Sequence, residues 1–158
     1  MERRFPGRPT GVLSPGTTNM FTPEQLAQAN AMCAGTLMET LGIVFIGSSA
    51  DEVAATMPVG PTVHQPLGLL HGGATVALAE SLGSASSYLL IDKEKQAVVG
   101  IEVNANHIRS VRSGSVKATG RLLHKGRATH VWDIRVTNEQ SELVAVCRIT
   151  NMIIDRRT

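Results

Sequence analysis

The sequence predicts an α+β fold in which a curved antiparallel sheet wraps around one long helix. Residues 71–88 are small or apolar on all sides of a helix and contain a single charge, Glu80; such a helix is normally buried. Four strand-like stretches separated by short polar turns follow it, and consecutive strands of this kind form an antiparallel meander. A sheet must cover its apolar face, and no other long apolar helix is available. The sheet is therefore expected to surround this helix.

The composition is that of one globular domain. The chain has 158 residues, of which 42% are hydrophobic and 18% charged, which permits a sizeable core. The formal net charge is +2 and aromatic residues make up 3%, so we expect no nucleic-acid partner. Cys33 and Cys147 lie far apart without metal-ligand spacing, and we expect two small buried hydrophobes. We predict no metal and no cofactor.

The N-terminal segment has no helical or strand-like period. Residues 1–20 are rich in Pro, Gly and Thr, and we expect a flexible tail before a single domain over residues 21–158. Pro and Gly follow Arg3 and Arg4 where a signal peptide would need an apolar stretch, and no apolar run reaches transmembrane length. We therefore expect a cytoplasmic protein without a membrane partner.

A first helix is predicted to begin at Thr22. Thr22 and Gln25 have the spacing of a capping box, and Pro23 suits the first helical position. Apolar residues recur at helical intervals as far as Leu41, although Gly35 is able to split the run. Strands are predicted over residues 43–48, 52–59, 98–108, 115–123, 129–136 and 143–154.

Two of these predictions concern the surroundings of the long helix. A loop rich in Pro and Gly is expected between Pro58 and His71, and the helix should run from about Gly72 to about Leu90. In the strand over residues 98–108, every second residue from Val99 to Ala105 is apolar, which predicts that these residues share the buried face.

Glu80 is the leading candidate for chemistry. Burying an isolated carboxylate costs free energy unless the group is paired, and carboxylates in such places tend to mark functional sites. The alternative is a position at the rim of the helix, in contact with solvent or a basic partner. Ser84 lies one turn after Glu80 on the same face, where it serves either the site or the packing of the helix.

The start of the helix is the second candidate. Gly72 and Gly73 permit close backbone approach, and the first N–H groups of a helix lack internal partners, so they can bind an oxyanion. Glu80 lies about two turns further on, roughly 12 Å away. A single chain cannot bring both groups to one atom, so the substrate must bridge them or a second chain must contribute.

Several motifs together resemble the hot-dog-fold acyl-CoA thioesterases. They are QPLGLLHGG at residues 65–73, AESLGS at 79–84, VGIEVNANH at 99–107 and VRSG at 111–114. The resemblance covers residues 22–154. It is greatest to the thioesterases of menaquinone synthesis that act on 1,4-dihydroxy-2-naphthoyl-CoA, to those of enterobactin proofreading, and to the Arthrobacter-type 4-hydroxybenzoyl-CoA group.

The resemblance implies a hot-dog fold and hydrolysis of an aromatic or medium-chain acyl-CoA to free acid and CoA. It implies that Glu80 is the nucleophile or general base and that the Gly72 N–H polarises the thioester carbonyl. It also implies that Gln65 and His71 line the carbonyl site and that Ser84 positions water. His71 has an alternative role as a structural hydrogen-bonding group before the helix. The family forms its site between two subunits, so we expect a homo-oligomer, a dimer of dimers.

Basic residues at two turns are candidates for binding the phosphates of CoA, namely Arg109 and Arg112 at one turn and Lys125 and Arg127 at the other. His107 is included in this group, although its position on the apolar side of its strand favours a satisfied core histidine. Two other functions compete with hydrolysis: a hot-dog enoyl hydratase or dehydratase, and a non-catalytic acyl-CoA-binding protein. Hydratases of this fold use a different acid/base set, commonly a His with Asp or Glu, and this helix offers no Asp beside Glu80.

Overall fold

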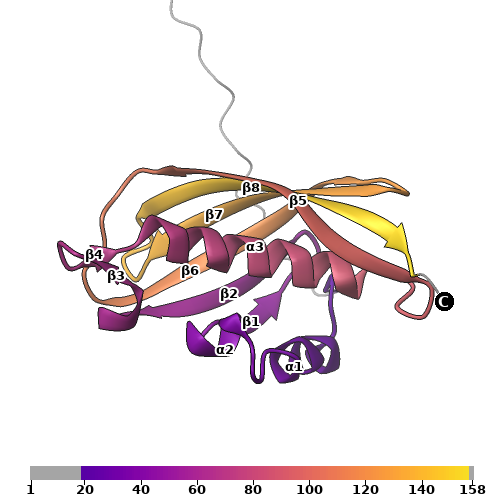
Figure 1. Ribbon diagram of the computed structural model, residues 1–158, viewed down its shortest axis with the longest axis horizontal. Coiled ribbons are helices and arrows are strands. Elements are labelled where there is room, and N and C mark those ends of the chain that lie inside the picture. Colours follow the sequence, from indigo (N-terminus) through magenta and orange to yellow (C-terminus); the bar gives the residue numbers. More distant parts are fainter. Residues whose placement is uncertain (1–18, 157–158) are drawn as a thin grey trace, which may run out of the picture.

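Six antiparallel strands and one long helix form the body of the computed structural model, which describes residues 19–156 (Figure 1). The strand order is β1-β2-β6-β7-β8-β5, and α3 lies across one face of this sheet. The predicted hot-dog architecture is confirmed. The elements are α1 Pro23–Ala31, α2 Leu37–Thr40, β1 Val44–Ser48, β2 Glu52–Val59, a 3-10 turn Pro61–Val63, β3 His64–Gln65, β4 Leu69–Leu70, α3 Gly72–Leu89, β5 Gln96–His107, β6 Gly114–Lys125, β7 Thr129–Asn138 and β8 Leu143–Asp155.

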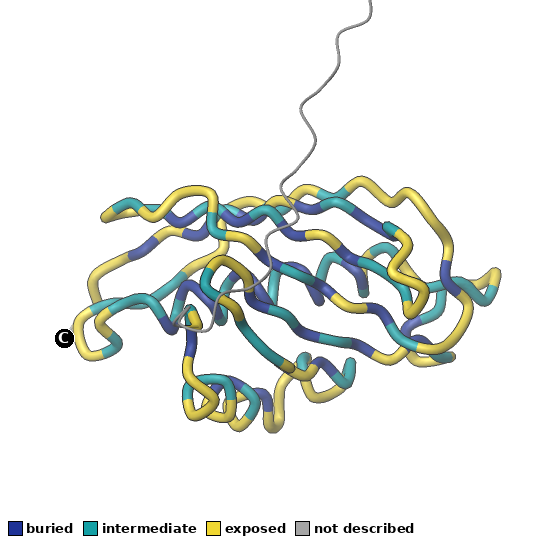
Figure 2. Tube along the Cα trace, turned by 180° about the vertical axis from the view of Figure 1, so that it is seen from behind, coloured by how far each residue is buried: buried dark blue, intermediate teal, exposed yellow. Residues whose placement is uncertain are grey.

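The core lies between α3 and the sheet. Leu78 and Leu82 of α3 are fully buried, as are Trp132 of β7 and Ile149 of β8. A side chain at Gly83 would begin 3.3 Å from Cβ of Ile149, so glycine allows the helix to approach the sheet closely here. Figure 2 shows buried and exposed residues alternating along the strands, as expected of a sheet with one covered face.

The helix α3 is buried on one side rather than all round. The residues facing the sheet are buried, whereas Ala77, Glu80, Ser81, Ser84 and Ala85 are half-buried. The prediction of burial on every side is therefore wrong for the single chain. The apolar character of the second side is explained by a cleft, described below, that α1 and α2 cover only in part.

The first predicted helix is confirmed at its start and divided further on. Thr22 and Gln25 form both hydrogen bonds of a capping box. The helix α1 ends at Ala31, and Gly35 adopts a φ of +71°, a left-handed conformation, in the turn that leads into α2 two residues later. Asn30 fixes α1 to the sheet, because its side-chain amide donates to the Phe45 carbonyl and accepts from the Phe45 N–H.

The meander prediction is wrong for β5. This strand pairs with β8 and not with β6, its successor in sequence, whereas β6, β7 and β8 do form a meander. Crossing from β5 to β6 means passing two strands, about 14 Å at the usual strand spacing. The six residues 108–113 can span about 20 Å when extended, so this connection is long enough to join β5 to β6. Consequently β5 becomes an edge of the sheet.

The face assignment within β5 is also partly wrong. The pairing with β8 shifts by one residue between Gly100 and Glu102, which marks a bulge. A one-residue shift moves side chains to the opposite face, so Val99 and Ile101 are exposed while Val103 and Ala105 pack against the core. The bulge also brings Gly100 opposite Asn151.

Other predictions concern the start of the domain and the cysteines. Of the expected tail, residues 1–18 lie outside the described part, while Met20 donates a hydrogen bond to the Ser49 carbonyl. Cys33 and Cys147 are both buried, as predicted, and burial raises the pKa of the Cys147 thiol to about 11.

The loop expected before His71 contains the 3-10 turn and the small β3–β4 sheet. Among residues 19–156, no helix has the length and apolar character needed to cross a membrane.

Candidate active site

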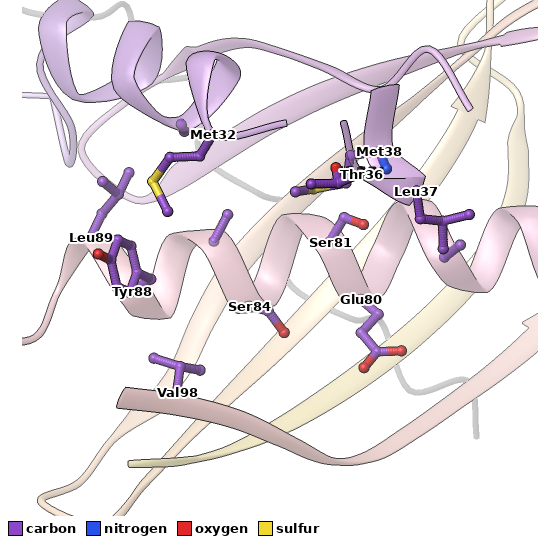
Figure 3. Close-up of a pocket in the computed structure, with 13 residues that line it drawn as sticks. Met32, Thr36, Leu37, Met38, Glu80, Ser81, Ser84, Tyr88, Leu89 and Val98 are labelled. Carbon is purple, nitrogen blue, oxygen red and sulfur yellow. Dashed lines mark hydrogen bonds between the residues drawn. The ribbon is translucent and has the colours of Figure 1, made fainter. Parts of the chain in front are cut away.

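Glu80 projects from the middle of α3 toward β5 (Figure 3). Its carboxylate lies against Gly100, where an added Cβ would be only 2.8 Å from Oε1. None of the ion pairs or hydrogen bonds found within residues 19–156 involves this carboxylate. Glu80 is half-buried rather than enclosed, and its free oxygens are available to a bound molecule.

A cleft of about 490 Å³ lies beside Glu80, between α3 and the two N-terminal helices (Figure 3). Met32 and Met38 line it from the α1–α2 side, Tyr88 lines it from α3, and Val98 lines it from β5. Ser84 also borders the cleft, and Figure 3 shows its hydroxyl on the same side of α3 as the Glu80 carboxylate. An apolar cleft with one carboxylate and a few hydroxyl groups suits an apolar ligand that carries one reactive polar group.

Ser84 is connected to a network of polar side chains that the sequence analysis missed. Its hydroxyl donates to Oδ1 of Asn151 over 3.1 Å, and Asn151 is fully buried. Asn151 Nδ2 donates in turn to the Gly83 carbonyl and to Ser87 Oγ, which also accepts from Trp132 Nε1. An Asn on the otherwise apolar inward face of β8 was the signal that could have revealed this network.

The N-terminus of α3 forms a second cavity, of about 340 Å³. Gln65, Gly72, His107 and Arg109 all line it, so the structure brings together four of the predicted site residues. None of the described residues accepts a hydrogen bond from the Gly72 N–H, whereas the Gly73 N–H donates to Nδ1 of His71 over 2.8 Å. His71 thus has the alternative role of a structural hydrogen-bonding group before the helix, since it is the N-cap of α3.

His107 is not the core histidine that its strand position suggested. It is exposed at the end of β5, and a Cβ at Gly72 would be 2.9 Å from His107 Nε2. His107 lies on the same face as Val103 and Ala105, but it is the last residue of the edge strand β5, where the strand borders the second cavity rather than the core. The imidazole therefore lies directly on the backbone of Gly72.

The two cavities are separate within one chain. They share no lining residue, and Gly72 and Glu80 are eight residues apart on one helix, roughly 12 Å. Gly72 and Glu80 are therefore as far apart in the folded chain as the sequence led us to expect.

The four basic residues form two distant sets. Arg109 pairs with Glu142 over 3.4 Å, and Arg112 Nη1 donates to the Leu67 carbonyl, both close to the Gly72 end of the molecule. Lys125 and Arg127 are exposed at the far end of β6, about 36 Å from its start by the strand rise. One chain cannot place all four on one small ligand. Residues 19–156 contain no cluster of His, Cys, Asp and Glu that could hold a metal ion.

Comparison with known proteins gives a consistent result. The sequence pattern of the thioesterase superfamily matches residues 67–145, half of the chain. The crystal structure of a mutant of thioesterase PA1618 from Pseudomonas aeruginosa has a TM-score of 0.82 and 46% identity, covering 83% of this chain and 94% of that one.

Several relatives have names that describe a reaction, among them the two that follow. The 1,4-dihydroxy-2-naphthoyl-CoA hydrolase of Escherichia coli is 45% identical over 129 residues, 82% of this chain and 94% of that protein. The proofreading thioesterase EntH of Cronobacter sakazakii is 43% identical over 129 residues, 82% of this chain and 93% of that protein.

Proposed function

This chain belongs to the thioesterase superfamily and is a thioester hydrolase, and we propose that it hydrolyses an acyl-CoA to the free acid and CoA. One observation carries the proposal: the Glu80 carboxylate, which has no ion-pair or hydrogen-bond partner among residues 19–156, lies at the edge of an apolar cleft with the Ser84 hydroxyl one turn away. Glu80 either attacks the thioester carbonyl carbon or takes a proton from the attacking water. If Glu80 attacks, the carbon–sulfur bond breaks to leave a mixed anhydride on Glu80, which water then hydrolyses to the free acid while a proton from that water goes to the CoA thiolate. If Glu80 is the base, water adds to the carbonyl carbon, the carbon–sulfur bond breaks, and the proton taken by Glu80 passes to the CoA thiolate.

The developing oxyanion needs hydrogen-bond donors, and we assign this role to the Gly72 N–H. It opens the N-terminus of an 18-residue helix, has no acceptor among the described residues, and lies where the helix dipole is positive. Gln65 lines the same cavity and is assigned to the carbonyl oxygen as well. His71 contributes by capping the helix and fixing the direction of its first N–H groups.

We propose that the site is completed by a second copy of the chain. Glu80 and Gly72 lie too far apart to act on one carbonyl within one chain, and β5, which covers Glu80, is a twelve-residue edge strand whose outer side is unpaired in the described chain. A symmetric dimer would supply Glu80 from one subunit and Gly72 with Gln65 from the other. Two such dimers would form the expected tetramer.

The acyl group is assigned to the cleft between α3 and the α1–α2 helices. Methionine side chains and the Tyr88 ring favour aromatic or medium-chain acyl groups, which are apolar and can be flat or extended. The phosphates of CoA are assigned to Arg109 and Arg112 or to Lys125 and Arg127. His107 is kept with the CoA-contacting groups, because it lines the cavity that contains Arg109.

The substitution Glu80→Gln tests the proposed chemistry. Gln keeps the volume of the side chain but cannot attack a carbonyl or accept a proton, so kcat should fall by at least about 10²-fold. The melting temperature should stay level or rise, because a half-buried charge is removed. Release of free thiol from a panel of acyl-CoA substrates measures turnover. Retained activity, or a collapse of the melting temperature, would make Glu80 a structural residue.

Mixing two inactive variants tests the shared site. A Glu80→Gln chain and a Gln65→Ala chain, unfolded together and refolded, should regain about one quarter of wild-type activity, since half of the dimers are hybrids with one intact site each. If each chain held a complete site, the mixture would stay as inactive as its components.

A further inference from the structure

The donors and acceptors of the polar network behind Ser84 are fixed. Trp132 Nε1 and Asn151 Nδ2 both donate to Ser87 Oγ, over 2.9 and 3.0 Å, and Ser84 Oγ donates to Asn151 Oδ1 over 3.1 Å. The indole N–H of Trp132 can only donate, and a backbone carbonyl such as that of Gly83 can only accept. These two groups decide how every side chain between them is oriented.

The Asn151 amide has one possible orientation. Its NH2 group must face the Gly83 carbonyl, 3.1 Å away, and it also reaches Ser87 Oγ. Its oxygen is therefore the atom that meets Ser84, and the Ser84 hydroxyl must donate its proton to that oxygen. The remaining lone pairs of Ser84 Oγ can then only accept a hydrogen bond from a molecule in the cleft.

The location of Asn151 relates this network to the carboxylate. A Cβ at Gly100 would be 2.8 Å from Glu80 Oε1 and 3.7 Å from Asn151 Oδ1, so both oxygens border the same gap beside β5. The other inward side chains nearby on β8, Cys147, Ile149 and Ile153, are apolar. An amide that is fully buried there is expensive unless all its polar atoms are used, and here they are.

We propose that Asn151 is a positioning residue that holds the Ser84 hydroxyl as a hydrogen-bond acceptor toward the hydrolytic water. Resting on the proposed function, this inference assigns Glu80 as the general base. The water donates one proton to Ser84 Oγ and the other to Glu80, which directs its oxygen lone pair at the thioester carbonyl carbon. The oxygen–carbon bond forms as Glu80 takes the proton. The carbon–sulfur bond breaks, and that proton passes to the departing CoA thiolate.

A double-mutant cycle tests whether Asn151 acts through Ser84. We expect Ser84→Ala and Asn151→Leu each to lower kcat about tenfold with little change in KM, because water is misplaced while acyl-CoA binding is retained. The double variant should be no slower than Ser84→Ala alone, because Asn151 has nothing left to orient. Asn151→Thr gives a second version should the Leu variant not fold. Its hydroxyl can donate as well as accept, so the direction of the Ser84 hydroxyl is no longer fixed.

The matched control is Ile149→Val, which shortens a buried neighbour of Asn151 that also packs against Gly83 but makes no polar contact. It should lower the melting temperature and leave kcat unchanged. Effects that multiply in the double variant, or unchanged kcat in a folded Asn151 variant, would overturn the assignment. A fully active Glu80→Gln would instead refute the proposed function, whereas an inactive Glu80→Gln with multiplying effects would refute the role of Asn151 alone.

Discussion

Gly100→Ala is predicted to slow turnover without weakening the fold. The new Cβ would be 2.8 Å from Glu80 Oε1, whereas ordinary contacts begin at 3.4 Å, so the carboxylate must retreat by about 0.6 Å. Asn151 Oδ1, at 3.7 Å, is not displaced. A misplacement of about 1 Å at a catalytic group can cost about 10²-fold in rate, so a loss on the order of tenfold in kcat is expected.

The stability of Gly100→Ala should not fall with its kcat. Gly100 has no left-handed φ, and glycine within a strand is less stable than alanine by about 0.5–1 kcal/mol, so the melting temperature should hold or rise. Gly47→Ala is the matched control, since nothing lies within 4 Å of a Cβ at that position on β1. Thiol release and thermal unfolding are measured on both variants. Unchanged kcat in folded Gly100→Ala would show that the place of the Glu80 carboxylate does not limit the reaction.

Three further predictions concern titration and substrate binding. Burial, reinforced by the positive charges of Lys125 and His124, lowers the pKa of His130, so stability should be full above about pH 6.5 and fall below it by up to about 1.4 kcal/mol per pH unit. Urea unfolding from pH 7.5 to 5 should show this loss, and His130→Gln should reduce it; equal slopes would contradict the assignment. Cys147, with its pKa raised to about 11 by burial, should resist iodoacetamide at pH 8 in the folded protein and react in urea, as mass spectrometry would show. Arg109→Glu should raise KM for CoA thioesters while sparing a short pantetheine thioester, because phosphate contacts supply uniform binding; equal loss on both substrates would mean a structural role.

The sequence was sufficient for features that depend on local patterns. The capping box at Thr22, the break at Gly35 and the boundaries of α3 were predicted within a residue or two, because each depends on residues close in sequence. The separation of Gly72 from Glu80 was also predictable, since the rise of a helix is constant.

Features that depend on pairing between distant strands were not predictable. The partner of β5 is set by a connection that passes two strands, and no local pattern distinguishes this from a simple meander. The bulge at Gly100 inverted the expected faces of Val99 and Ile101, and the end of the same strand brought His107 onto Gly72. Asn151 was missed because its partners lie more than sixty residues away in sequence.

The lining of the cleft comes from two parts of the molecule that tolerate change very differently. The helix α3 packs its other side into the core, so the position of its cleft-lining residues is fixed by the fold. By contrast α1 buries only Ala29 and α2 buries none of its residues, and Met32 and Leu37 are 48% and 61% exposed. Substitutions there cost little stability, as is usual for exposed positions. In evolution, selection can therefore reshape the cleft that we propose holds the acyl group through these two helices, while the groups on α3 proposed to act in hydrolysis stay constant.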